Sequence, residues 1–328
     1  MDLQKKKKFK LFNFNRDGKG VDPGEDTTPN LKFFFKQLWR KASKLLTLNM
    51  MMIVQVIPLF ASLYLYFIVT PTTPTALNPE FSALFGIQAA SGNAMSSLNL
   101  GFLSFQHPLP TYNTYVYWII GALMLFHVVT FGWQKVGSIY VMRGLVRGDS
   151  VFVWSDFFYA IRKNWKQGLI LGLIDCAVMF ALAFDVFYFF TSPSSGFNDF
   201  MYVLTIALII IYIIFRFYTY LMVVTFDMKL MKIFKNALIF VVLGIKRNIM
   251  ALLGLAVVTL FAVVLVIIFL PMGLGVTLVL PFVYYLALCA FIYTYAAYPV
   301  IEKYMIDPVA TKKSVEHDEE SSRVDNEE

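Results

Sequence analysis

Three ionisable residues lie inside long apolar runs of the chain: Lys135, Asp175 and Arg216. Asp175 lies about seven residues after the start of its run, and Arg216 about eight before the end of the next, so both sit roughly 10–13 Å deep in a helical span. Charged side chains are costly in hydrocarbon and are therefore paired or functional. We predict an intramembrane charged cluster. The favoured interpretation is an ion pair that locks neighbouring helices, joined by Lys135, and the alternative is a transport pathway.

Other residues with catalytic or metal-binding chemistry are scattered along the chain. His107, His127 and His317 lie far apart in sequence, and Cys176 and Cys289 both lie inside apolar runs. The sequence has no Walker A motif, no H-E-x-x-H, no G-x-S-x-G and no Cys/His cluster. We therefore expect no enzyme, no metal site, no cofactor and no disulfide framework.

The elements that must position the charged cluster are membrane-spanning helices. The chain is 58% hydrophobic and 17% aromatic, which is unusual for a soluble domain of its length. A helix needs about 20 apolar residues to cross the hydrocarbon, and no series of short alternating segments indicates a barrel. The six runs that qualify are Met50–Val69, Tyr115–Val141, Gly168–Phe190, Phe200–Val224, Ile249–Leu270 and Met272–Tyr298.

Lysine and arginine are distributed to one side of these spans. None of the 28 falls in the stretches 71–114, 191–199 or 271–277, which alternate with basic segments along the chain. Basic residues concentrate in cytoplasmic loops, so this pattern predicts a multi-pass protein of the cell membrane with both termini cytoplasmic. The first 49 residues are rich in charge and hold no signal-peptide core, so the first span is predicted to be a retained signal anchor.

Three domains follow from this pattern. Residues 1–30 are predicted to be a disordered basic tail and linker, 31–308 the membrane domain, and 309–328 a disordered acidic tail. Lysines and phenylalanines alternate near the N-terminus beside a span, which suits the bilayer and its anionic lipids and not nucleic acid. The long outer loop 71–114 is apolar and rich in small residues, so it is either a re-entrant hairpin or the lining of an outward cavity.

An internal repeat organises the membrane domain. Basic residues precede an asparagine at three predicted membrane borders, Asn49, Asn164 and Asn248, and each asparagine opens an outward span that is followed by a return span. The fold class predicted is all-α, with three helical hairpins that each carry a cytoplasmic amphipathic interfacial helix. Coincidence of basic residues and asparagine at membrane borders is the alternative.

The interfacial helices are candidate contact surfaces. In the first, Lys32, Lys36, Arg40 and Lys44 recur every four residues. Such a helix lies in the headgroup plane, or it docks on a cytoplasmic protein. The residues predicted for partner docking lie on the second and third helices and are Trp154, Phe157, Phe158, Arg162, Trp165 and Phe234.

Several short motifs carry a family resemblance. They are Gly137-Ser138-Ile139-Tyr140, Arg147-Gly148-Asp149, Ser155-Asp156-Phe157-Phe158, Lys163-Asn164-Trp165-Lys166-Gln167, Phe226-Asp227 and Asn236-Ala237-Leu238. On these residues the chain resembles the YesL-type (DUF624) family of bacterial integral membrane proteins. That resemblance implies an association with carbohydrate ABC importers in Firmicutes and no defined biochemical role. The 71–114 insertion departs from the family pattern, and the chain lacks the E-A-A loop with which import permeases grip their ATPase.

Three function classes fit the sequence. The predicted function is an accessory or regulatory membrane protein whose partners include ABC transporter subunits, because basic amphipathic helices form a platform without a substrate motif. The alternative is an independent small-solute transporter, which the hairpins and intramembrane charges would suit. A lipid-modifying enzyme has the least support.

Overall fold

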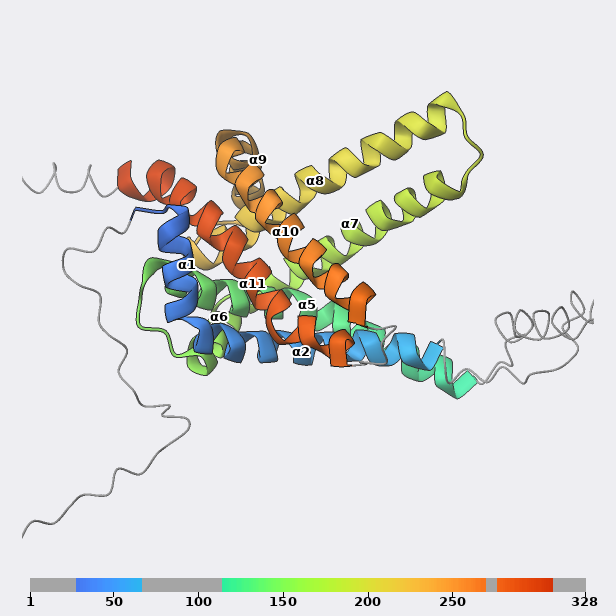
Figure 1. Ribbon diagram of the computed structural model, residues 1–328, viewed down its shortest axis with the longest axis horizontal. Coiled ribbons are helices and arrows are strands. Elements are labelled where there is room, and N and C mark those ends of the chain that lie inside the picture. The colour runs from blue at the N-terminus through green and yellow to red at the C-terminus, as the bar shows by residue number, and fades with distance from the viewer. Residues whose placement is uncertain (1–27, 67–113, 270–275, 309–328) are drawn as a thin grey trace, which may run out of the picture.

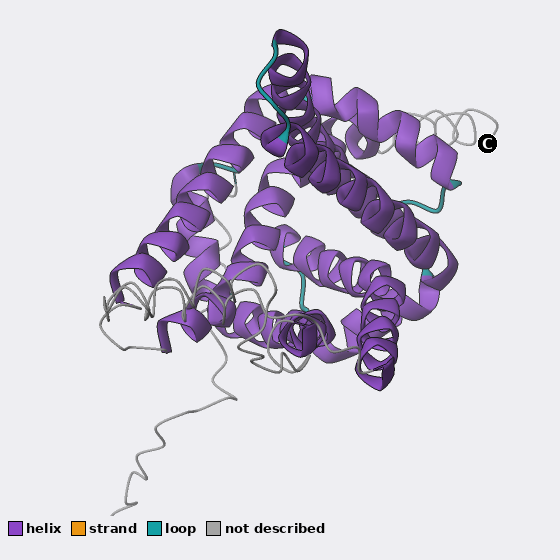
Figure 2. Ribbon diagram, turned by 90° about the vertical axis from the view of Figure 1, so that its right-hand side faces the viewer, coloured by secondary structure: helices purple, strands orange, loops and turns teal. Residues whose placement is uncertain are grey.

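The computed structural model describes residues 28–66, 114–269 and 276–308. All regular structure in these ranges is helical, and Figure 2 shows no strand among them. The predicted tails and the outer loop 71–114 lie outside the described residues, apart from residues 28–30 and Thr114. The all-α fold class is therefore confirmed for the described part of the chain. The helices are α1 (Leu31–Arg40), α2 (Ala42–Tyr64), α5 (Thr114–Arg147), α6 (Val153–Lys163), α7 (Trp165–Thr191), α8 (Gly196–Thr225), α9 (Leu230–Leu243), α10 (Ile245–Phe269) and α11 (Val276–Ile301), which continues into a short π-helical turn (Glu302–Ile306).

Six of these helices are long and apolar enough to cross a membrane: α2, α5, α7, α8, α10 and α11 with its π-helical turn. The prediction of six spans is confirmed in number among the described residues, with helix bounds that differ by up to several residues, and helix length and composition indicate a multi-pass membrane protein. The helices overrun the apolar sequences at their basic ends. α5, for example, continues to the basic residue Arg147.

The long helices pack around α5 and α11. α5 lies against α2, α7, α8 and α6, while α11 packs along α10 and α2 and also touches α5. The buried core gathers where these helices meet α1, α6 and α9, and it includes Leu48, Met142, Tyr218 and Phe291. Towards the opposite end α7 and α8 diverge from the other helices, as Figure 1 shows. The charged cluster therefore belongs to the tightly packed half of the molecule.

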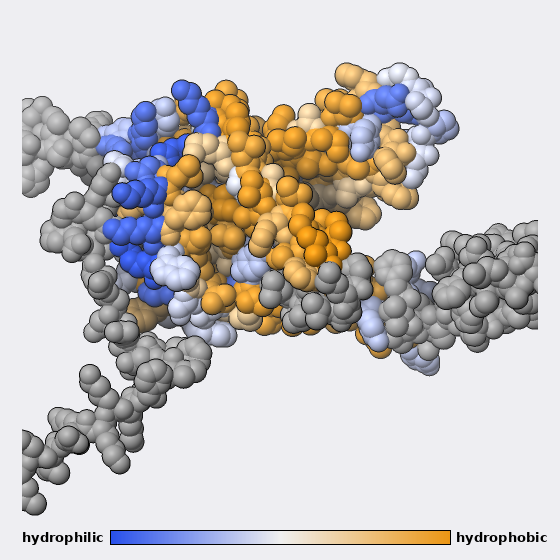
Figure 3. Space-filling view, viewed as in Figure 1, coloured by the Kyte–Doolittle hydropathy of each residue, from blue (hydrophilic) through white to orange (hydrophobic). Residues whose placement is uncertain are grey.

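Hydropathy is layered across the molecule. Figure 3 shows a hydrophilic surface over α1 and the adjoining helix ends, an apolar surface across the middle, and a second hydrophilic patch at the α7–α8 tip. Large apolar side chains in the apolar layer are exposed, among them Phe180, Phe184, Val257 and Leu260. Exposed apolar surface of this extent needs a covering, which lipid acyl chains supply.

A short helix precedes a long one three times, each time across a single-residue junction. The junctions are Lys41 between α1 and α2, Asn164 between α6 and α7, and Gly244 between α9 and α10. The repeated arrangement into hairpins with interfacial helices stays a prediction. Its register differs from the one proposed from the sequence, because only Asn164 stands at a junction while Asn49 and Asn248 lie within α2 and α10.

Asn49 and Asn248 make side-chain hydrogen bonds to other segments of the chain, and they do not mark equivalent helix boundaries. The Asn49 side chain joins α2 to α11: its amide donates to the Phe282 carbonyl, and its Oδ1 accepts from the Ala287 N–H at 2.9 Å. Asn248 accepts from the Tyr218 hydroxyl at 2.7 Å and donates to the Val241 carbonyl at 2.9 Å. Each fixes one long helix against its surroundings.

The basic periodicity of the first interfacial helix is interrupted. The four-residue spacing from Lys32 to Lys44 suggests one helix, whereas the chain turns at Lys41. The turn allows Gln37 of α1 to reach across to α5, where its amide donates to the carbonyls of Leu145 and Val146 at 2.9 and 2.8 Å. α1 is thereby bonded to the bundle on one face.

Candidate functional site

A buried carboxylate forms the centre of the intramembrane cluster. Asp175 of α7 is only 1% exposed. Its Oδ1 lies 2.7 Å from the Arg216 Nε and accepts from the Tyr212 hydroxyl at 2.9 Å, and its Oδ2 accepts from the Tyr220 hydroxyl at 3.0 Å. The three partners are spaced four residues apart on α8, so a single face of that helix supplies them all. The structure thus brings together the predicted Asp175 and Arg216.

Lys135 of α5 lies beside this pair without bonding to it. Its ammonium nitrogen sits 5.4 Å from the centre of the Phe131 ring, and the Arg216 guanidinium sits 5.9 Å from the same ring. Among the described residues, Lys135 makes no ion pair with a carboxylate. A cation over an aromatic face gains about 0.5–2 kcal/mol, and the ring leaves the charge of the lysine uncompensated.

The geometry of Asp175 serves to hold two helices together. A carboxylate with a cation and two hydroxyl donors has its charge compensated, so removal from water is offset by bonds within the protein. Tyr212 and Tyr220 were not among the predicted site residues. The sequence does indicate them, because they lie four residues before and four after Arg216 and residues at that spacing share a helix face.

The α5–α7 crossing that sets the depth of Asp175 is a contact between glycine backbones. A Cβ placed on Gly132 of α5 would lie 1.9 Å from the Gly168 oxygen, and one on Gly172 would lie 2.5 Å from the Gly132 Cα. Small residues let membrane helices approach this closely. Gly168 and Gly172 form a G-x-x-x-G pattern within an apolar run, a signal for such a crossing that sequence analysis had not used.

The predicted docking residues separate into two groups on α6. Phe157 is 6% exposed and packs against α5, where Gly137 has no side chain: a Cβ there would meet the Phe157 ring at 2.7 Å. The assignment of Phe157 to a docking surface is therefore wrong. Trp154 and Phe158, which are four residues apart, differ from it: Trp154 is 61% exposed and stacks on the exposed Phe158 with ring centres 6.3 Å apart. Arg162 follows Phe158 by one turn and is also exposed.

We call Trp154, Phe158 and Arg162 the α6 stripe. The other two predicted residues are not part of it. Trp165 is exposed but belongs to the first turn of α7, and its backbone oxygen accepts from the Trp133 indole of α5 at 2.9 Å. Phe234 of α9 is half-buried and packs against Phe215 of α8, with ring centres 5.8 Å apart. The α6 stripe is therefore narrower than the predicted surface.

Within the described residues, no group of three or more His, Cys, Asp and Glu side chains could hold a metal ion. The two cysteines are free thiols, Cys176 next to Asp175 on α7 and Cys289 on α11. Neither site described above therefore offers a set of metal ligands.

The central part of the chain is similar to a known protein family. Residues 112–186 match the model of DUF624, described as "Protein of unknown function, DUF624". The resemblance deduced from the sequence is confirmed there, and the match covers α5, α6 and most of α7, with both the α6 stripe and Asp175 inside it. A search of curated proteins and a search of solved structures each found no match.

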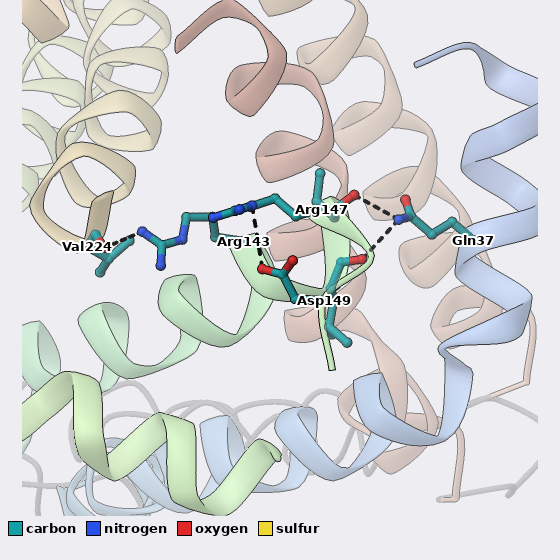
Figure 4. A network of polar contacts seen from close by, with 7 residues as sticks. Gln37, Arg143, Arg147, Asp149 and Val224 are labelled. Carbon is teal, nitrogen blue, oxygen red and sulfur yellow. Dashed lines mark hydrogen bonds and ion pairs between the residues drawn. The ribbon is translucent and has the colours of Figure 1, made fainter. Parts of the chain in front are cut away.

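The matched segment also takes part in a polar junction at the end of α5 (Figure 4). Arg143 donates to the Val224 carbonyl in the last turn of α8, and Arg147 pairs with Asp149 at 3.5 Å. Gly148 between them has φ +85°, a conformation that glycine adopts without strain. The Arg147-Gly148-Asp149 motif thus ends α5 in a fixed turn, and Gln37 from α1 binds the carbonyls just before it.

Proposed function

We propose that this chain is an accessory or regulatory membrane protein that acts through a protein partner docked on the α6 stripe. The observation that carries the proposal is that Trp154, Phe158 and Arg162 project from a helix whose opposite face is buried against α5. Tryptophan and arginine are the residues that most often anchor protein interfaces. A stripe fixed on a packed helix presents these anchors at a low cost in ordering entropy.

The partner class follows from the family resemblance. That resemblance points to carbohydrate ABC importers, so the occupant we propose is a membrane or ATPase subunit of such an importer. An acidic surface on that subunit would complement Arg162 and the neighbouring exposed Lys163. The intramembrane charges do not require a transport role, since Asp175 is compensated by its three partners on α8.

We also propose that the stripe and both termini face the cytoplasm of a cell membrane. Support comes from the alternation of basic and charge-free segments along the sequence and from the hydrophilic surface over α1 (Figure 3). On α1 the apolar residues Leu31, Phe35 and Trp39 are exposed along one stripe. Burial and the neighbouring cations Lys44 and Arg40 lower the pKa of Lys41, so an anionic lipid headgroup beside this helix would favour its charged form.

The docking proposal predicts loss of a partner without loss of the fold. We expect Trp154→Ala with Phe158→Ala to abolish co-purification of importer subunits from native membranes in mild detergent, because both removed rings lie on the surface. The control replaces one exposed tryptophan and one exposed phenylalanine elsewhere, Trp118→Ala with Phe184→Ala, and should retain the partner. Subunits would be identified by mass spectrometry, and folding by size-exclusion profile. Full retention of importer subunits by the α6 variant would reject docking on this stripe.

An independent small-solute transporter is the alternative, and a separate measurement distinguishes it. Proteoliposomes that contain only this protein should show no substrate flux if it is an accessory subunit. Flux that exceeds protein-free liposomes would favour the transporter, whatever the outcome of the docking experiment.

The orientation predicts which surface positions an impermeant reagent reaches. In a background without Cys176 and Cys289, we expect Gly196→Cys in the α7–α8 turn to react with a membrane-impermeant maleimide on intact cells. Ser155→Cys on α6 and Lys235→Cys on α9 should react only after the cells are opened, although all three positions are exposed in the structure. Labelling of Ser155→Cys on intact cells would contradict the proposed orientation.

A further inference from the structure

The intramembrane cluster carries more positive than negative charge. Lys135, Asp175 and Arg216 come from α5, α7 and α8, and Asp175 is the carboxylate that pairs with Arg216. The Lys135 ammonium and the Arg216 guanidinium lie 5.4 and 5.9 Å from the centre of the same Phe131 ring, so two cations and one carboxylate belong to this cluster. One positive charge is therefore left without a counter-charge among the described residues of this part of the span.

Hydrogen-bond donors in the cluster are also unused. Arg216 meets Asp175 through Nε, and its two terminal nitrogens make no hydrogen bond within the described structure. The Lys135 ammonium likewise has no hydrogen-bond acceptor there and only the Phe131 ring beside it. Both side chains are half-buried and not sealed, with 19% of the Arg216 side chain exposed. Two cationic groups whose donors have no acceptor among the described residues thus lie at one aromatic ring.

An uncompensated charge and unmet donors in low dielectric favour binding of an anion. The donor set selects its chemistry: a guanidinium edge and an ammonium are the groups that bind carboxylate and phosphate oxygens. The other titratable side chains near these cations are thiols and phenols: Cys176 of α7, Cys289 and Tyr293 of α11, and the two tyrosines already bonded to Asp175. None of them supplies a second carboxylate.

We propose that Lys135 and Arg216 form an intramembrane binding site for an oxyanion, a carboxylate or a phosphate group. The site goes beyond the docking function and does not depend on it. Asp175 is ten residues from the start of α7, so the site lies about 15 Å along the span from that end. The oxyanion comes either from a free solute or from an anionic lipid headgroup drawn in beside α5.

Binding is testable on the purified full-length chain in an uncharged detergent. At constant ionic strength, replacing sodium chloride by sodium phosphate or sodium acetate should raise the Tm saturably by several degrees, because a ligand that binds the folded state stabilises it. Lys135→Gln should weaken the apparent affinity at least tenfold. Lys163→Gln, which neutralises an exposed lysine on α6, should leave it unchanged. The proposal would be overturned if the Tm of Lys135→Gln rose as much as that of the parent. It would also be overturned if neither a free oxyanion nor an anionic lipid raised the Tm of the parent.

Two further measurements identify the source and guard against a misfolded variant. If phosphatidylglycerol added to the micelles raises the Tm of the parent but not of Lys135→Gln, and phosphatidylcholine does not, a lipid headgroup occupies the site. Equilibrium dialysis of the parent with radiolabelled phosphate should show about one saturable site per chain if the anion is free. Lys135→Arg keeps the charge and should retain binding, so if Lys135→Gln does not fold, loss of binding in a folded Lys135→Arg variant would overturn the proposal.

Discussion

Gly132→Ala is expected to destabilise the membrane bundle by more than about 3 kcal/mol, the upper end of the usual cost of overpacking a core. The added methyl group would lie 1.9 Å from the Gly168 oxygen and 2.7 Å from the Gly172 Cα, which are backbone atoms of α7. A clash with a flexible side chain is relieved by rotation, whereas a clash with backbone is relieved only by moving the helix. Separation of α5 from α7 would also remove the frame that positions Asp175.

The matched control lies on the same helix. Gly121→Ala makes the identical chemical change on α5 at a position where nothing lies within 4 Å of the new Cβ. Alanine is the better helix former by about 1 kcal/mol, so this variant should be as stable as the parent or slightly more stable. Thermal unfolding in detergent, followed by size-exclusion chromatography of the heated samples, compares the two. Equal melting of Gly132→Ala and Gly121→Ala would show that the close crossing is absent.

The six spans could be predicted from sequence because lipid imposes a simple rule on backbone polar groups. A run of about 20 apolar residues has few structures available to it other than a helix. The helix ends and junctions were less predictable. Lys41 breaks a regular basic periodicity because Gln37 bonds to α5, a contact between residues about a hundred positions apart in the chain. Periodicity reports local preference and contains no information on such a partner.

The charged pair could be predicted from the sequence, whereas the exposure of the docking candidates on α6 could not. A carboxylate and a guanidinium at similar depth in adjacent spans have a strong incentive to meet, so Asp175 and Arg216 could be paired from their positions alone. On α6 the apolar residues have no such constraint. Phe157 and Phe158 are chemically alike, and what buries the first is the missing side chain of Gly137 on α5. Helix rotation is fixed by that neighbour and not by the α6 sequence.

Asp175→Ala is expected to cost about 3–5 kcal/mol of stability, as removal of one partner of a buried ion pair does. The substitution strands the Arg216 guanidinium and leaves the hydroxyls of Tyr212 and Tyr220 without their acceptor. Because Lys135 remains nearby, two positive charges would then share the site. Asp185→Ala, on the same helix and without an ion pair in the described structure, should have little effect on the Tm in detergent.

A double variant of Asp175 and Arg216 distinguishes an ion pair from a contact that depends only on shape. Asp175→Asn keeps the size of the side chain and an oxygen acceptor for the tyrosines, and Arg216→Gln removes the charge that would otherwise be stranded. The double variant should therefore recover most of the stability that either single variant loses. The coupling energy of the double-mutant cycle would then have the opposite sign to the two single effects. Strictly additive losses would mean that the two charges are solvated independently. In that case the α7–α8 contact would be held by the two tyrosine hydrogen bonds and by apolar packing. The positive charge of Lys135 would then have no bearing on how α7 and α8 pack.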